Sequence, residues 1–409
     1  MQHAESQSSF SRRSFLQLST AVSTAVGLGI VTEPMLAWGG RKAVQKDAVI
    51  INQNENPLGP SETARAAATA MVQDGGRYQW ELTEDLVETF AKIEGLKSEY
   101  VQAFPGSSDP LHFAVMTFTS PTRSYVTADP GYEAGMFTSE RSGARVVKVP
   151  LTKTYAHDVK SMLAAAPDAG LFYICSPNNP TGTLTPHSDI EYLVEKKPKG
   201  SMVLVDEAYL HFCDAPSVLD LVKADKEIIV LRTFSKIYGM AGLRCGFAIG
   251  RPDLLEKVHN TGGWNFMPVP AVAAASASLT DPKLVPERRR VNAAIRTEVF
   301  DWLDRNRYAY IPSQSNCFLL DTKRAGKDVM DAMEQQGVII GRVWPVMPTW
   351  VRITVGTRSE MDRFQVAFKR VMDGTAVEWV NEGHGDGIGT ISLIRRKPES
   401  SSENLISGP

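Results

Sequence analysis

The chain has 409 residues, of which 43% are hydrophobic and 22% are charged, an ordinary globular composition with enough length for two domains. Its formal net charge is −2, from 44 basic and 46 acidic residues, so no excess of one sign favours nucleic acid or an anionic membrane as a partner. The four cysteines are widely spaced and the seven histidines show no H-E-x-x-H pattern, so the sequence does not favour a metal site.

Residues 1–39 are typical of a targeting segment. Arg12-Arg13 is followed by Phe15-Leu16 and by a mildly apolar run, 18–31, and Ala37-Trp38-Gly39 fits a small-x-small cleavage site. The pattern resembles a twin-arginine export signal, and the run is too short and too polar for stable membrane insertion. We therefore expect recognition by the twin-arginine export machinery and a periplasmic or otherwise exported protein. The alternative is an untargeted amphipathic N-terminus.

Residues 40–75 are expected to form a polar arm, over 40–60, and a first helix that begins after Ser61. A second helical stretch follows at 84–93. From there to about residue 281, short apolar runs alternate with stretches of helical spacing, which predicts a large α/β domain, over 76–281, with a mainly parallel seven-stranded sheet and helices on both faces. The expected strands lie near 100–104, 124–128, 145–149, 171–175, 202–206, 228–232 and 245–249, and the expected helices near 109–118, 132–141, 158–165, 188–196 and 252–260.

The pattern changes at about residue 282. A long helical stretch and then shorter strands and helices predict a smaller α+β domain over 282–374, followed by a flexible or loosely packed tail over 375–409. In the small domain, helices are expected at 285–306, 326–336 and 358–373, and strands near 308–311, 316–321, 338–343 and 350–355.

Polar residues follow five of the predicted strands, at the edge where parallel sheets bind ligands. The run Gly106-Ser-Ser-Asp109 opens a helix and would present N–H groups to an anion, although a plain N-cap is the alternative. Tyr132 would stack on a planar ligand or pack in the core. Asn179 lies in a loop fixed by two prolines and a glycine, and Asp206 ends an apolar strand where it needs a cationic or donor partner. Lys236 follows the strand at 228–232, where desolvation favours a neutral amine that can attack a carbonyl.

As an ordered set, these motifs resemble those of the fold-type I pyridoxal-phosphate-dependent aminotransferases of class I/II, and in particular the histidinol-phosphate aminotransferase-like branch. The resemblance covers about residues 48–373. The motifs that carry it are Asn54-Glu-Asn-Pro-Leu-Gly59, Arg77-Tyr78, Gly106-Ser-Ser-Asp109, Asn179-Pro-Thr-Gly182, Asp206-Glu-Ala-Tyr209, Thr233-Phe-Ser-Lys236, Ala241-Gly-Leu-Arg-Cys-Gly246 and Val351-Arg-Ile-Thr-Val-Gly356.

The resemblance implies a pyridoxal 5'-phosphate cofactor, held by Lys236 as a Schiff base, with the same lysine carrying a proton during catalysis. Asp206 would keep the ring nitrogen protonated, Tyr209 and Asn179 would hydrogen-bond the ring oxygen, and Tyr132 would stack on the ring. The residues expected at the cofactor phosphate are Ser107, Ser108, Ser235 and Arg244, together with Tyr78 from the partner subunit of a homodimer.

For the substrate, the resemblance implies that Arg352 binds a carboxylate through two hydrogen bonds. Arg342 and Asn56 complete the predicted substrate-binding set. Trp264, Phe266 and Trp344 lie in segments that line the substrate pocket in the family, with core packing as the alternative.

The chain also departs from the histidinol-phosphate enzymes. Gln79-Trp80 follows Tyr78 where proline is usual, Pro110 replaces an acidic residue, and an export signal argues against histidine biosynthesis. The sequence therefore predicts an aminotransferase that moves an amino group between an amino acid, preferably with a bulky or aromatic side chain, and a 2-oxo acid. The alternatives are another pyridoxal-phosphate reaction, such as decarboxylation, elimination or cyclisation, and a non-catalytic binding protein, which would be expected to have a damaged site.

Overall fold

The computed structural model describes residues 32–38, 47–263 and 266–374. The Arg12-Arg13 motif and apolar run of the predicted export signal, and the predicted tail at 375–409, lie outside the described residues. No helix within the described ranges is both long and apolar enough to span a membrane.

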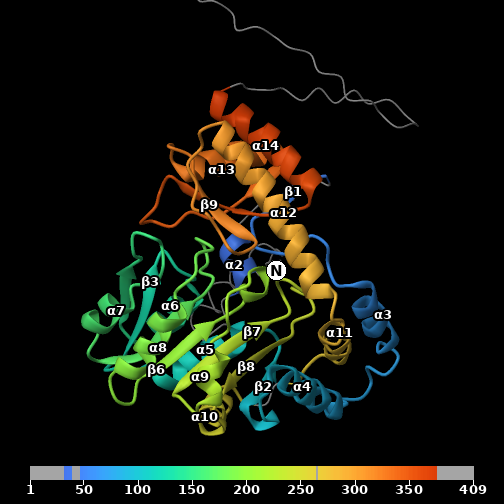
Figure 1. The fold of residues 1–409 in the computed structure, drawn as a ribbon, viewed down its shortest axis with the longest axis vertical. Helices are drawn as coiled ribbons and strands as arrows, with labels where there is room; N and C mark the ends of the chain where they lie inside the picture. The colour runs from blue at the N-terminus through green and yellow to red at the C-terminus, as the bar shows by residue number, and fades with distance from the viewer. Residues whose placement is uncertain (1–31, 39–46, 264–265, 375–409) are drawn as a thin grey trace, which may run out of the picture. The chain divides into compact units, whose positions relative to one another are not determined.

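A mainly parallel sheet forms the centre of the larger part of the structure (Figure 1). Its strands are β2 (Val101–Phe104), β3 (Ser124–Asp129), β4 (Val146–Pro150), β5 (Ala169–Cys175), β6 (Met202–Asp206), β7 (Ile228–Thr233) and β8 (Gly246–Gly250). Over the described ranges their spatial order is β2-β8-β7-β6-β5-β3-β4, and β8 alone runs antiparallel to its neighbours. Strands β5, β6 and β7 are buried throughout, as expected where helices cover both faces. The predicted sheet is confirmed, with each strand within two residues of its expected bounds.

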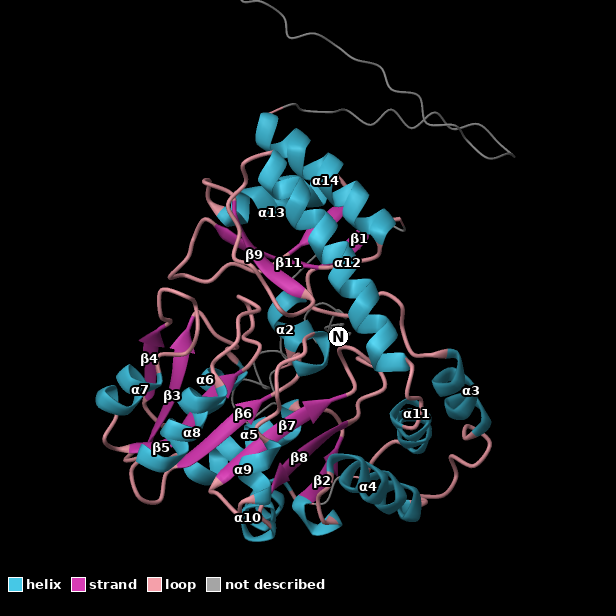
Figure 2. Ribbon diagram, in the orientation of Figure 1, coloured by secondary structure: helices cyan, strands magenta, loops and turns pink. Residues whose placement is uncertain are grey.

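Helices pack around this sheet (Figure 2). Two of them, α9 and α11, were not predicted. The α11 sequence, VPAVAAASASL, is small and apolar on nearly every side, so it has no amphipathic period to detect. The helices of this part are α3 (Glu62–Ala70), α4 (Trp80–Glu94), α5 (Ser108–Phe118), α6 (Ala134–Arg141), α7 (Val159–Ala165), α8 (His187–Lys196), α9 (Leu219–Lys223), α10 (Pro252–Gly262) and α11 (Val269–Leu279), with 3-10 helices η1 (Ser98–Tyr100) and η2 (Leu210–Phe212).

A second hydrophobic core lies under two small sheets. Its elements are β1 (Val49–Ile51), α12 (Leu284–Arg305), β9 (Cys317–Asp321), α13 (Gly326–Gln335), β10 (Val338–Ile340), β11 (Trp350–Thr354) and α14 (Arg358–Asp373). Strand β9 pairs with β11 antiparallel, and β1 pairs with β10 parallel. The strand predicted near 308–311 is wrong: only Tyr310 forms an isolated bridge, to Leu320. Pro312 follows at once and has no N–H with which to extend the pairing.

The prediction of a polar arm over 40–60 is wrong at the centre of that range, where the chain forms β1. Ile51 is 2% exposed and joins the second core, whereas the adjacent Ile50 is 45% exposed. A three-residue strand is too short to show an alternating pattern in sequence, so its pairing with β10, almost 290 positions away, could not be foreseen.

A short helix, α2 (Glu33–Trp38), lies between the main sheet and the small sheets (Figure 1). These six residues belong to the segment that the sequence assigns to the export signal. The helix begins with Pro34 in its first turn, a position that proline favours because the missing N–H has no partner there.

Ile51→Ala is expected to lower the free energy of unfolding by about 2–5 kcal/mol, because it opens a cavity in the second core. Ile50→Ala is the matched control on the same strand, and since its side chain is largely solvated it should cost on the order of 0.5 kcal/mol. Guanidinium denaturation of the two variants checks this. Equal losses would contradict the assignment of Ile51, and not Ile50, to the core.

Candidate active site

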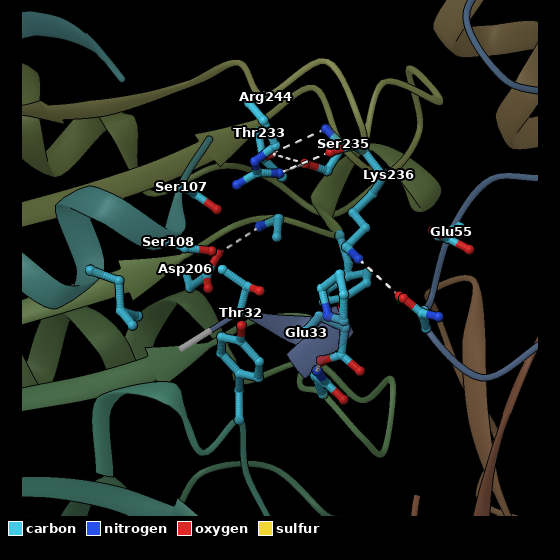
Figure 3. Close-up of a pocket in the computed structure, with 18 of the residues that line it drawn as sticks. Thr32, Glu33, Glu55, Ser107, Ser108, Asp206, Thr233, Ser235, Lys236 and Arg244 are labelled. Carbon is cyan, nitrogen blue, oxygen red and sulfur yellow. Dashed lines mark hydrogen bonds between the residues drawn. The ribbon is translucent and has the colours of Figure 1, made fainter. Parts of the chain in front are cut away.

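A cavity of about 270 Å³ lies at the edge of the main sheet where the parallel strands end (Figure 3). Because β8 runs the opposite way, its start lies at this edge too, and Arg244 comes just before it. The structure thereby brings together residues separated by more than 130 positions. The predicted residues that line the cavity are Ser107, Ser108, Tyr132, Asn179, Asp206, Tyr209, Ser235, Lys236 and Arg244.

Lys236 provides the nucleophilic amine of the cavity. Its side chain is buried, and Nζ donates to the carbonyl of Gln53 at 3.3 Å and lies 5.6 Å from the centroid of the Tyr209 ring. Burial lowers the pKa of Lys236, and the charge of Arg352 acts in the same direction, while Glu33 opposes both. A larger fraction of the amine is therefore neutral than in water, which is the form that attacks a carbonyl.

Asp206 places a carboxylate at the end of β6. Oδ2 accepts a hydrogen bond from the Tyr173 hydroxyl at 2.9 Å, and Oδ1 accepts one from the Ala208 N–H at 3.0 Å. Burial raises the pKa of Asp206 to about 6, although both hydrogen bonds and the charge of Lys236 lower it. The adjacent Glu207 pairs instead with Arg232 at 2.6 Å. Asp206 is thus the member of the acidic pair that is available to a cationic group in the cavity.

The opposite part of the cavity is suited to an anion. Arg244 Nη1 donates to Ser235 Oγ at 3.3 Å, and Nη2 donates to the Pro105 carbonyl at 3.3 Å. Gly106 has φ +90°, and a side chain there would collide with the Arg244 guanidinium. Arg244 itself has φ 62°, a left-handed conformation that a non-glycine residue adopts only under local constraint. The backbone is therefore shaped to bring this guanidinium beside serine hydroxyls (Figure 3).

Tyr209 and Asn179 form the wall on the other side of Lys236. The Tyr209 hydroxyl accepts a hydrogen bond from Asn54 Nδ2 at 3.0 Å. Asn179 is buried, and its Oδ1 accepts from Arg352 Nη1 at 2.9 Å. Asn179 therefore connects the cavity to the arginine that the sequence predicts to bind substrate.

Arg352 lies directly behind the cavity and is fully buried. Nη2 donates to the Asn52 carbonyl at 2.5 Å and contacts Glu33 Oε1 at 2.6 Å. Arg342 lies beside it because the Arg352 N–H donates to the Arg342 carbonyl at 3.0 Å. The Arg342 guanidinium contacts Glu133 Oε2 at 2.9 Å and Glu33 Oε2 at 3.2 Å.

Several predicted residues lie outside this cavity. The Asn56 side chain donates to the Ile237 carbonyl at 2.9 Å, so it holds the loop after Lys236. Tyr78 is 73% exposed and stacks on Phe266 beside a separate cavity. Trp344 is buried, and its indole N–H donates to the Gly131 carbonyl at 2.8 Å. Trp264 lies outside the described residues.

Sequence reasoning missed three residues that the structure brings to the site: Asn54, Tyr173 and Glu33. Asn54 lies in a motif that carries the family resemblance but is not among the predicted site residues. Tyr173 lies inside an apolar strand, where its buried hydroxyl was a usable signal because such a group needs a partner. Glu33 lies in the segment that the sequence predicts to be an export signal. Among the described residues no cluster of His, Cys, Asp and Glu side chains is suited to a metal ion.

Comparison with known proteins assigns this geometry to a family. Residues 46–368 match the family model "Aminotransferase class I and II". The chain is 34% identical to a histidinol-phosphate aminotransferase of Symbiobacterium thermophilum over 329 residues, which cover 80% of this chain and 91% of the relative. It is 32% identical to that of Moorella thermoacetica, over 80% of this chain and 86% of the relative.

Solved structures agree with this match. The histidinol-phosphate aminotransferase of Sinorhizobium meliloti in complex with pyridoxal 5'-phosphate is 26% identical, with a TM-score of 0.74 over 91% of this chain and 100% of that one. An aspartate aminotransferase of Thermus thermophilus with maleate, at 19% identity and a TM-score of 0.70 over 89% of this chain and 100% of that one, shares the fold.

The donor set of the cavity fits the same cofactor. A buried amine, a buried carboxylate and an arginine–serine anion site match the aldehyde, ring nitrogen and phosphate of pyridoxal 5'-phosphate. The chain is a pyridoxal-phosphate-dependent transaminase and belongs to the class I and II aminotransferase family.

Proposed function

We propose that this aminotransferase moves the amino group between an amino acid with a bulky or aromatic side chain and a 2-oxo acid. The observation that supports amino acid and 2-oxo acid substrates is Arg352, a fully buried guanidinium directly behind the cavity that holds Lys236. Since a planar guanidinium binds carboxylates through paired hydrogen bonds, it suits the carboxylate that amino acids and 2-oxo acids share.

The lining of the cavity supports a set of cofactor contacts. Arg244, Ser235, Ser107 and Ser108 would bind the phosphate, and Tyr132 would cover the ring face. Pyridoxal 5'-phosphate, when bound, supplies an electron-withdrawing ring that stabilises negative charge at the substrate Cα. The Asp206 carboxylate would keep a proton on the ring nitrogen, for which its position at the buried end of the cavity is suited.

Lys236 would both bind the cofactor and move the proton. Its Nζ has one hydrogen bond to a neutral carbonyl, Gln53 O, and lies over the Tyr209 ring. Burial lowers the pKa of this amine, which favours the neutral form that accepts a proton from the substrate Cα and then returns it. Tyr209 and Asn179, on the same side, would orient the reacting groups by hydrogen bonds.

The contacts of Arg342 favour a substrate whose side chain carries no charge. Its guanidinium contacts the carboxylate of Glu133 at 2.9 Å, so the protein itself compensates its charge. A phosphate, as in the histidinol phosphate for which the relatives are named, would have to compete with Glu133. A bulky or aromatic side chain without charge avoids that competition.

The transaminase is tested by its two half-reactions on the purified chain loaded with cofactor. Absorbance should convert from the pyridoxal to the pyridoxamine form with an aromatic amino acid and revert with a 2-oxo acid. Lys236→Ala should lose both conversions by at least about 1,000-fold, since it removes the amine that carries the proton. Release of CO2 or ammonia without conversion would favour another pyridoxal-phosphate reaction. Histidinol phosphate used better than phenylalanine would overturn the proposed substrate class.

Tyr173→Phe removes a hydrogen bond to the Asp206 carboxylate, worth about 1.5–3 kcal/mol to that charged form, or roughly one to two pKa units. The pKa of Asp206, already raised by burial, should rise further, so the group is protonated up to a higher pH. The acidic limb of the kcat/KM profile should therefore move to higher pH. Tyr125→Phe is the control, because Tyr125 is also buried and its ring centroid lies 6.2 Å from that of Tyr173. The Tyr125 hydroxyl makes no hydrogen bond to Asp206. Coincident profiles would refute this role of Tyr173.

We also infer a homodimer. Tyr78, Trp80 and Phe266 surround a cavity of about 490 Å³ and are 73%, 60% and 53% exposed, an arrangement that favours cover by a second copy of the chain. Sedimentation at the mass of one chain would contradict the dimer.

We further infer export by the twin-arginine route. This proposal is supported by Arg12-Arg13 and by the apolar run that follows. Unchanged cell fractionation of an Arg12→Lys, Arg13→Lys chain would contradict the export route.

A further inference from the structure

One wall of the cavity that holds Lys236 is made by the chain's own N-terminal segment. Thr32, Glu33 and Pro34 line the cavity, and Figure 3 shows Thr32 and Glu33 away from the group formed by Ser235 and Arg244. Glu33 is 8% exposed although it lies before the polar arm, and the next turn of α2 is anchored by Ala37, which is buried. The segment is therefore seated in the site.

The Glu33 carboxylate contacts three side chains. Oε1 accepts from Arg352 Nη2 at 2.6 Å. Oε2 accepts from Arg342 Nη2 at 3.2 Å and from Asn179 Nδ2 at 3.4 Å. Arg352 and Asn179 are also hydrogen-bonded to each other, so the three groups form one recognition site for a carboxylate.

Glu33 supplies the charge that Arg352 needs. Arg352 is 0% exposed, and its other hydrogen-bond acceptors, Asn179 Oδ1 and the Asn52 carbonyl, are neutral. A buried guanidinium without a carboxylate is strongly destabilised, so some carboxylate must lie here. Within the described residues Glu33 is the acidic partner of Arg352, whereas Arg342 also has Glu133. A substrate carboxylate that binds Arg352 must therefore replace Glu33.

We propose that Thr32–Trp38 is an intramolecular competitor of the substrate, with Glu33 in the place of the substrate carboxylate on Arg352. This inference rests on the proposed role of Arg352 in binding substrate. Because the segment is joined to β1 through residues 39–46, its local concentration does not fall on dilution. The predicted cleavage site at 37–39 lies after Glu33, so removal of the export signal would also remove the competitor. The unprocessed chain is thus held in a low-affinity state and the processed enzyme is released from it.

Carboxylate binding to the full-length, cofactor-loaded chain tests the proposal. The probe is 3-phenylpropanoate, which has a carboxylate and an aromatic group but no amine to transaminate, and its affinity is measured by calorimetry. Glu33→Gln should tighten binding by at least about tenfold, because the competing charge is removed while the side-chain volume is kept. Glu191→Gln, at an exposed position on α8, is the matched control and should bind as the wild type does.

Two further variants make the outcomes distinct. Glu33→Asp retains the charge with a shorter reach and should show an intermediate affinity, and it replaces Glu33→Gln if that chain does not fold. Arg352→Lys in the Glu33→Gln chain should abolish the gain. Equal affinities of the wild type and Glu33→Gln, with loss of binding in the Arg352→Lys chain, would overturn the competitor while leaving Arg352 as the substrate ligand. Binding that is unaffected by Arg352→Lys would overturn the proposed function of that residue and the competitor with it.

Discussion

The site depends on the direction of the strands in one sheet. Parallel strands end at a common edge, and their buried interiors admit few polar side chains, so the polar groups collect where the backbone leaves the sheet. Asp206 is the last residue of such a strand, and Lys236 and the loop with Asn179 follow the ends of two others. The reversal of β8 adds Arg244 from the start of a strand to the same edge. The sheet topology thus determines which reactive groups meet in the cavity.

Charge compensation then couples this edge to the second core. Arg352 is borne by β11, next to β9, while Asn179 follows β5 of the main sheet. A buried cation between two cores needs hydrogen-bond acceptors and a negative charge, which are supplied by Asn179, by the Asn52 carbonyl after β1 and by the Glu33 carboxylate. The guanidinium therefore joins groups from both cores while Glu33 compensates its charge.

Much of this could be predicted from sequence, for a physical reason. Strands such as β5 and β6 are continuous apolar runs that end in polar motifs, and the family resemblance orders those motifs along the chain. What could not be predicted depended on long-range contacts. The burial of Ile51 requires β10, the bond from Tyr173 requires the register between β5 and β6, and Glu33 acquires its environment from residues 146 to 319 positions away. Local pattern also failed for α11, whose composition is apolar on nearly every side.

The pairing of β1 with β10 has a consequence for Lys236. Gln53, whose carbonyl accepts from Lys236 Nζ at 3.3 Å, comes two residues after Ile51, which belongs to the second core. Lys236 itself follows β7 of the main sheet. The reactive amine and its hydrogen-bond acceptor are therefore supplied by different cores, so a strand pairing remote in sequence from Lys236 fixes the group that this nitrogen contacts.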